Sequence, residues 1–520
     1  MNTDTDFIKS ICNINVIYIG VDKCFKVCDN SQYTHALGNI FRVCKRGVYE
    51  MLKEEKFDWG SFIKKLSAIA IPVAFQNLLT TTGSMVDTMM IAPLGESSVG
   101  AVGLCAQFSV LMFAAYWGFI GGGMLFFAQY WGAGDDDGIY RSYGTTLMCL
   151  ITVGVIFAFL GIFMPEFIMS VYTDKATIQK IGCEYLRVVG FSYPIMIISV
   201  GMSALLRSTG RVKIPLYASI ASVATNVCLN WVFIYGHFGF HPMGVRGAAL
   251  ATVCASVVNV SVMLVISRIH GVPYFFHLGR CFRQTKAWLA EYFKKCFPIA
   301  CNEVLIGVGN MIINVALGRQ NERVIAAIAV FRTLEGLVIA FFSGFSNASS
   351  VLVGKNVGAG NLEKAYERAK RLVFLCCGCI AVVCLTLIAV HTPLLTVMSL
   401  SGESFRAATV LLCIYSVYAI FRMGNWVQND TYRSAGDAAY GTVLEISFMY
   451  IMVLPCVCLS AFYFKVPYYI IFVCCYIDEP IRFLLMQRHM YSGKWIKPVT
   501  ENGKEALAEF FDKRRRKSAL

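Results

Sequence analysis

Twelve long apolar segments constrain the fold of this chain more than any other feature of its sequence. They run over residues 66–93, 98–131, 142–165, 180–207, 213–235, 245–268, 295–318, 324–355, 368–390, 405–433, 440–463 and 467–490. Each has about 20 or more residues, enough to cross a hydrocarbon core about 30 Å thick as a helix. Backbone groups in lipid must bond within their own segment, and the alternating pattern of a barrel strand is absent. The sequence therefore predicts an all-α integral membrane protein with twelve transmembrane helices.

The charged residues support this interpretation. They make up only 15% of the 520 residues, whereas a soluble domain has about 25%. The net charge of +14 is carried by loops between the apolar segments, as the positive-inside rule requires, so we do not expect a nucleic-acid partner. Most of the 21 cysteines lie inside apolar segments, where they act as small hydrophobic side chains.

An internal repeat divides the apolar segments into two sets of six. The motif pairs Pro72/Pro298, Gly132/Gly358 and Arg207/Arg433 are each separated by the same 226 positions. Because each half has an even number of spans, both halves insert with the same orientation. We expect two six-helix bundles related by a pseudo-twofold axis along the membrane normal, which is a transporter architecture with its binding site between the halves.

The distribution of basic residues predicts the domains and their orientation. Lys and Arg are dense in the central linker and in the C-terminal tail, and absent between Pro93 and Gln107. Both termini are therefore expected in the cytoplasm, with the protein in the cell (plasma or inner) membrane. The expected domains are a cytoplasmic extension (1–60, with Met51 as an alternative start), a first bundle (61–268), a basic linker (269–294), a second bundle (295–490) and a basic tail (491–520).

Polar stripes in the first half predict an ion-coupling site. Gln76, Thr80, Gly83 and Asp87 share one helix face, and an ionisable residue within a span is a functional candidate by default. Oxygen atoms of Asp87, Asn226, Asn230 and Thr252 can hold a proton or a sodium ion. The alternative for Asp87 and the two asparagines is a purely structural role as hydrogen-bonding residues between helices.

The second half predicts a substrate cavity with an acidic group. Glu303 occupies the position of Asn77 in the first half and heads a stripe that continues through Gly307, Asn310 and Asn314. An anionic group near a central cavity would attract cationic, lipophilic substrates. The expected cavity residues are Gln76, Asn77, Asn302, Glu303 and Asn310, with a structural role for Glu303 as the alternative.

Two clusters of charges in the second half are expected to be structural. Arg332 and Glu335 are three residues apart, as are Glu479 and Arg482, which allows an ion pair within one helix. Asp478 lies beside the second pair. We interpret these residues as paired charges that hold helices in register, and a proton path is the alternative.

Motifs along residues 64–497 resemble the multidrug and toxic compound extrusion (MATE) family, in particular a bacterial branch of it. The residues that carry the resemblance are Pro72 with Gln76-Asn77, Val86-Asp87-Thr88, Leu94-Gly95, Ala128-Gln129, Gly132-Ala133-Gly134-Asp135, Leu206-Arg207-Ser208-Thr209-Gly210, Gly244-Val245-Arg246-Gly247-Ala248-Ala249, Gly358-Ala359-Gly360-Asn361 and Ser492-Gly493-Lys494-Trp495-Ile496. The resemblance implies alternating access and export of drugs or metabolites against inflow of H⁺ or Na⁺.

The resemblance also implies roles for particular residues. It assigns ion coupling to Asp87, Asn226 and Asn230, although some members of the family carry Asp where this chain has Asn230, which leaves the choice between H⁺ and Na⁺ open. The family often has an acidic residue in the helix of Glu303, usually about one turn further along.

The expected function is thus secondary antiport of drugs, toxins or small organic metabolites, many of them cationic. A flippase for a lipid-linked or amphiphilic substrate is the alternative. The spans contain no Ser/His/Asp set and no metal-binding His pair, and the chain has no GxxxxGK[ST] motif. We therefore expect no enzyme activity, and no cofactor or metal apart from the coupling ion. The expected partners are a small-molecule substrate and the lipid bilayer, with the protein as a monomer.

Overall fold

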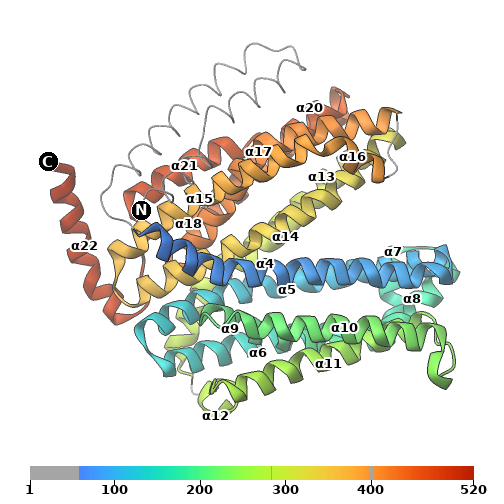
Figure 1. Ribbon diagram of the computed structural model, residues 1–520, viewed down its shortest axis with the longest axis horizontal. Coiled ribbons are helices and arrows are strands. Elements are labelled where there is room, and N and C mark those ends of the chain that lie inside the picture. Colours follow the sequence, from blue (N-terminus) through green and yellow to red (C-terminus); the bar gives the residue numbers. More distant parts are fainter. Residues whose placement is uncertain (1–57, 283, 399–401, 520) are drawn as a thin grey trace.

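The computed structural model describes residues 58–519 except 283 and 399–401, and every regular element in these residues is a helix (Figure 1). The predicted cytoplasmic extension and the alternative start at Met51 lie almost entirely outside the described residues. The helices of the first half are α4 (Trp59–Ile91), α5 (Glu96–Ala133), α6 (Asp136–Phe163), α7 (Pro165–Tyr172), α8 (Ala176–Val189), α9 (Ser192–Ser208), α10 (Lys213–Tyr235) and α11 (Val245–Ile269).

The second half repeats this order, and its helices are α12 (Leu278–Cys281), α13 (Lys286–Gly318), α14 (Glu322–Gly358), α15 (Leu362–Ala389), α16 (His391–Val397), α17 (Gly402–Ser434), α18 (Ala438–Phe448), α19 (Leu454–Cys458), α20 (Tyr468–Cys474), α21 (Glu479–Ser492) and α22 (Glu501–Ala519). The π-helical turn Met449–Val453 joins α18 to α19, and a second one, Leu459–Tyr463, extends α19, so that Ala438–Tyr463 is one continuous span. Helix α13 begins at Lys286, inside the segment that the sequence assigned to the linker.

The predicted all-helical membrane fold is confirmed, with two of the twelve segments departing from a straight helix. Ten described helices are long and apolar enough to cross a membrane, and the segment 180–207 forms the pair α8 and α9, bent by 52°. The last segment, 467–490, is broken between Cys474 and Glu479. Pro480 lies in the first turn of α21, where a backbone N–H has no partner within the helix, so its absence costs nothing. In a helix that continued from α20, the same proline would remove a backbone hydrogen bond.

The two halves cross at one end through reciprocal glycine contacts. A Cβ on Gly132 of α5 would lie 2.0 Å from the Lys355 carbonyl oxygen, and a Cβ on Gly358 of α14 would lie 1.9 Å from the Gln129 carbonyl oxygen. Gly132 and Gly358 are 226 positions apart, and so are Gln129 and Lys355. The contacts are thus equivalent, and they place the pseudo-twofold axis between α5 and α14.

The bundles meet at this crossing and separate toward their opposite ends, where α7 and α8 of the first half lie far from α16 and α20 of the second (Figure 1). We call the crossing the closed end. It carries the two Gly-Ala-Gly turns, in which Gly134 and Gly360 adopt positive φ angles of 73° and 76°. Asp135, directly after the first of these turns, caps the long span α6 by accepting from Gly138 N at 2.8 Å.

The C-terminal segment packs against both halves at the closed end. The Gln129 side chain of α5 is fully buried, donates to the Ser434 carbonyl and accepts from Val499 N, each at 2.8 Å. Thr500 donates to the Gly358 carbonyl at 2.8 Å, and Trp495 is fully buried. The tail is therefore part of the structure that holds the closed end together.

A buried carboxylate anchors this docked segment. Asp437, in the turn between α17 and α18, accepts from His489 Nε2 at 3.0 Å and from Lys497 Nζ at 2.8 Å. Burial by itself raises the pKa of Asp437, but the hydrogen bonds from His489 and Lys497 outweigh burial, and the pKa lies below its ordinary value of 3.8. A lowered folded-state pKa stabilises docking above the unfolded pKa, and this stabilisation is lost as pH falls through the folded value.

Replacing Asp437 with asparagine is expected to loosen the tail at neutral pH. A hydrogen bond to a charged group contributes about 1.5–3 kcal/mol, so amide exchange in residues 493–500 should accelerate by about tenfold or more. The difference between the wild type and Asp437→Asn should shrink as pH falls below about 4 and vanish once the pH lies below the lowered folded-state pKa. Hydrogen–deuterium exchange of both proteins at each pH measures it, and a difference that persists at low pH would contradict this role.

Candidate functional site

The first half contains a carboxylate held by an amide from a neighbouring helix. Asp87 lies four residues before the end of α4 and accepts a hydrogen bond from Asn230 Nδ2 of α10. Asn226 and Asn230 are one helical turn apart, so they share a face of α10, and Asn230 Nδ2 also lies 3.3 Å from Asn226 Oδ1. Asn230 is completely buried. Three of the four predicted ion-coupling residues therefore lie together between α4 and α10.

This cluster contains oxygen atoms that can still accept a hydrogen bond or bind a cation. The buried Oδ1 of Asn230 has no hydrogen-bond donor among the described residues, and no described basic side chain forms an ion pair with Asp87. Thr252, the fourth predicted residue, donates to the Ala248 carbonyl of its own helix at 3.0 Å. Tyr185 of α8 connects it to the cluster, because this tyrosine lies near both Thr252 and Asp87. Sequence reasoning missed Tyr185, because nothing distinguishes it from other aromatic residues in its segment.

Most of the residues predicted for the substrate cavity form hydrogen bonds or ion pairs with neighbouring helices. Gln76 donates to Ser219 at 3.0 Å, and Asn302, at the equivalent position of the second half, donates to Glu445 at 3.1 Å. Asn77 donates across the halves to Ser343. Four of the five predicted residues are engaged in hydrogen bonds or ion pairs, and Asn310 alone among the five lines a pocket inside the second half. These interactions join helices, so the structure favours a positioning role for Gln76 and Asn302.

Two equivalent arginines stand near the junction of the halves in different surroundings. Arg207 donates to Gln76 Oε1 at 2.9 Å and lies 3.5 Å from Asn347 Oδ1, with no acidic ion-pair partner among the described residues. Arg433 instead contacts Glu303 at 3.2 Å and Asp430 at 3.8 Å. Arg433 is thus shared by Glu303 and Asp430, so this group has an excess of one negative charge, and the role of Glu303 as an attractor of cations stays a prediction.

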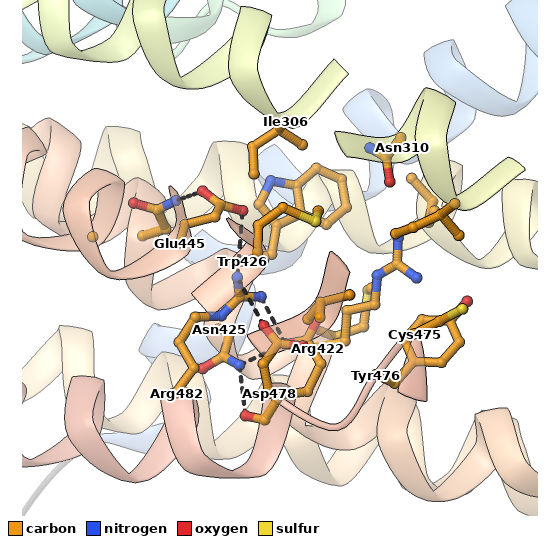
Figure 2. A pocket seen from close by; sticks show the side chains of 18 of the residues that line it. Ile306, Asn310, Arg422, Asn425, Trp426, Glu445, Cys475, Tyr476, Asp478 and Arg482 are labelled. Atoms are coloured by element: carbon orange, nitrogen blue, oxygen red, sulfur yellow. Dashed lines mark hydrogen bonds and ion pairs between the residues drawn. The ribbon is translucent and has the colours of Figure 1, made fainter. Parts of the chain in front are cut away.

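The second half encloses a pocket with a volume of about 270 Å³ (Figure 2). Its charged lining residues form two groups. Around Glu335, just behind the wall, lie Arg332 at 2.7 Å, Arg422 at 2.5 Å and the Tyr476 hydroxyl at 3.0 Å.

The second group surrounds Arg482. Its guanidinium contacts Glu479 at 2.8 Å, Asp478 at 3.4 Å and Glu445 at 3.7 Å. The five charged residues singled out from the sequence therefore belong to two networks that also include Arg422 and Glu445. Sequence reasoning missed these two, although an ionisable residue inside an apolar segment is a signal that could have found them.

Removal of the Glu335 charge is expected to destabilise the second half. Glu335 is only 3% exposed and is the carboxylate that faces both Arg332 and Arg422. Leaving buried charges uncompensated costs about 3–5 kcal/mol, so Glu335→Gln should lower the thermal unfolding midpoint in detergent markedly. Glu166→Gln is the matched control, because its ion pair with Arg187 is exposed and contributes about 0–1 kcal/mol. Equal midpoints for the two variants would show that Glu335 does not hold this network together.

Comparisons with known proteins agree with this architecture. A family model described as MatE matches residues 72–232 and again residues 298–459, so the two matches begin 226 positions apart (72 and 298). The probable multidrug resistance protein YoeA of Bacillus subtilis (strain 168) is 23% identical over 401 residues, which are 76% of this chain and 86% of that protein. The uncharacterized transporter YisQ of the same organism is 23% identical over 414 residues, covering 79% of this chain and 90% of that protein.

A solved structure shows the same fold. The crystal structure of MATE in complex with MaD3S has a TM-score of 0.74 at 17% identity and covers 83% of this chain and 96% of that one. Two parallel repeats of membrane helices, with a polar site inside each, define this protein as a membrane transporter. Within that class, the chain belongs to the MATE family of multidrug efflux transporters, because the family model covers more than half of its length.

Proposed function

We propose that this protein is a secondary antiporter that exports small organic molecules in exchange for H⁺ or Na⁺. The observation that carries the proposal is Asp87, a carboxylate within a span that no described basic side chain neutralises. Such a group is costly in a membrane unless it binds a proton or a cation. The Asn226 and Asn230 oxygens beside it are suitable additional ligands for sodium.

Coupling follows if the ion and the substrate favour different conformations. The described conformation is closed at the end that holds the Gly132 and Gly358 crossing, and the opposite ends of the bundles are apart (Figure 1). We place the closed end in the cytoplasm of a cell membrane, because the basic linker and tail lie there. Ion binding at Asp87 then stabilises one conformation and substrate loading the other, and this difference in affinity couples the two flows. We expect the monomer to be sufficient.

The test is gradient-driven efflux from proteoliposomes. The purified full chain is reconstituted, the vesicles are loaded with ethidium, and either a pH gradient or a Na⁺ gradient is imposed with the ion in excess outside. Loss of ethidium under one gradient and not the other would establish antiport and identify the ion. No ethidium movement under either gradient would contradict cation antiport.

Arg207 favours a second candidate, a flippase for an amphiphile with an anionic headgroup. A flippase for phosphate-bearing lipids needs a cationic cavity, and Arg207 is a guanidinium between the halves with no described acidic partner. Vesicles with fluorescent phospholipid in one leaflet test this candidate. Protein-dependent exposure of the label to a reductant outside, without any ion gradient, would favour the flippase over the antiporter.

A further inference from the structure

The charged pocket of the second half is not required by the repeated fold. The positions 226 residues before Arg332, Glu335, Arg422 and Glu445 are occupied by Ala106, Ser109, Met196 and Ser219. The register is secure, because the hydrogen bond from Gln76 to Ser219 is repeated by the one from Asn302 to Glu445. The first half packs the same helices without these charges, so packing alone does not explain them.

The charges of the pocket are partly uncovered. The side chains of Arg332, Arg422 and Glu445 are 37%, 28% and 24% exposed. Charged groups within a span do not face hydrocarbon, because that placement costs several kcal/mol. The pocket must therefore open to an aqueous space, from which a polar ligand can reach it.

The two charged groups have opposite formal charges and are spatially separate. Arg332 and Arg422 against Glu335 leave an excess of one positive charge, whereas Glu445, Asp478 and Glu479 against Arg482 leave an excess of two negative charges. Figure 2 shows Glu445, Asp478 and Arg482 on one side and Arg422 with Tyr476 and Cys475 on the other. The pocket is thus dipolar.

Hydrogen-bonding atoms match this separation. On the acidic side, the Oδ1 atoms of Asn425 and Asn429 are buried without a donor among the described residues, and these side chains donate their own amides to Glu479 and Glu445. Unused acceptors suit an ammonium group, which has only donors. On the opposite side, the planar guanidinium groups of Arg332 and Arg422 suit a carboxylate. Trp426, Ile306 and Met449 add apolar lining for a hydrophobic body.

We propose that this pocket binds small zwitterions, molecules that carry an ammonium group and a carboxylate on a compact apolar body. The carboxylate faces Arg332 and Arg422, and the ammonium faces Glu445 and the Asn425 and Asn429 oxygens. The volume of about 270 Å³ is near the lower end of the range for ligand pockets, about 300–1,000 Å³. As a statement about cargo, the proposal rests on the transport function above and adds zwitterions to the expected substrates.

Calorimetric titration of the purified full chain in detergent tests the proposal with two zwitterions, phenylalanine and 4-(aminomethyl)benzoate. Each is compared with its methyl ester, which keeps only the ammonium, and its N-acetyl form, which keeps only the carboxylate. At least one zwitterion should bind at least tenfold more tightly than both of its singly charged forms. Absence of binding by both zwitterions, or equal binding of the singly charged forms, would overturn the proposal.

Variants assign each end of the ligand. Arg422→Gln should weaken zwitterion binding at least tenfold and leave binding of the methyl ester unaffected. Glu445→Gln should also weaken zwitterion binding at least tenfold, and it should leave binding of the N-acetyl form unaffected. Arg406→Gln, an exposed position on the same helix, is the matched control and should change nothing. Arg422→Lys, which keeps the charge, and a monodisperse elution profile separate loss of the site from misfolding. Arg422→Gln or Glu445→Gln protein that keeps the full preference for the zwitterion would overturn the assignment.

This equilibrium measurement is independent of any gradient. If ethidium efflux is coupled but neither zwitterion binds, the antiport proposal stands and the pocket assignment fails. If a zwitterion binds as described but no gradient drives efflux, the pocket assignment stands and antiport fails.

Discussion

Asp87→Asn is expected to abolish gradient-driven efflux while leaving membrane insertion and substrate binding intact. Asparagine keeps the size of the side chain and can still bond Asn230, but it neither binds a proton nor supplies a charge to a cation. A site that no longer distinguishes ion-bound from ion-free states exerts no bias on the conformational equilibrium, so coupling is lost. Ethidium efflux under the driving gradient should fall to the level of protein-free vesicles, a loss of more than tenfold.

The matched control is Asp174→Asn, which removes the same charge from an exposed loop between α7 and α8. It should transport as the wild type does. Equal reconstitution is checked by the amount of protein recovered in the vesicles. Normal efflux by Asp87→Asn would show that the coupling ion binds elsewhere, with Glu303 and Asp430 as the next candidates.

Gly358→Val is expected to drive the closed end apart. A Cβ at this position meets the Gln129 carbonyl oxygen at 1.9 Å, and backbone atoms do not move aside cheaply. Overpacking costs about 1–3 kcal/mol, and alternating access, as proposed, requires this contact to separate in the opposite conformation. The variant should therefore shift the equilibrium by roughly 5–150-fold toward a conformation open at this end.

Distances between spin labels measure the shift. Labels on unnatural amino acids at positions 213 and 364, exposed sites at the closed end of opposite halves, should report a longer distance in Gly358→Val. Gly336→Val is the control in the same helix, because nothing lies within 4 Å of a Cβ there. An unchanged distance in Gly358→Val would mean that the crossing is not a gate.

The sequence determined the repeated architecture because a 226-residue offset is visible in motifs alone. The same offset predicts which positions are equivalent. Gly132 and Gly358 are such a pair, because at each of them a main-chain carbonyl oxygen of the other half occupies the space that a side chain would need. The bend between α8 and α9 and the break before Glu479 were not predicted. The segment 180–207 is apolar enough to span, and hydropathy does not report helix direction. The segment 467–490 carries Asp478, Glu479 and Arg482 at and after its break.

The candidate site was predictable only in part. Asp87 lies on the polar face of α4, and Asn226 and Asn230 lie on one face of α10. The spacing of polar residues in each segment predicts both faces. The three side chains therefore meet once α4 and α10 are neighbours. The pocket of the second half depends on which helices face one another. Arg422 reaches Glu335 from a helix 87 positions further along the chain, and nothing local in the sequence pairs them.

Reversed transport is the most direct test of the proposal that ion binding and substrate binding stabilise different conformations and thereby couple the two flows. Proteoliposomes receive an ethidium gradient and no ion gradient, and H⁺ and Na⁺ are followed with fluorescent indicators. Ethidium moving in one direction should drive one of these ions in the other, and Asp87→Asn should abolish the ion flux. Ethidium that equilibrates while neither ion moves would contradict antiport.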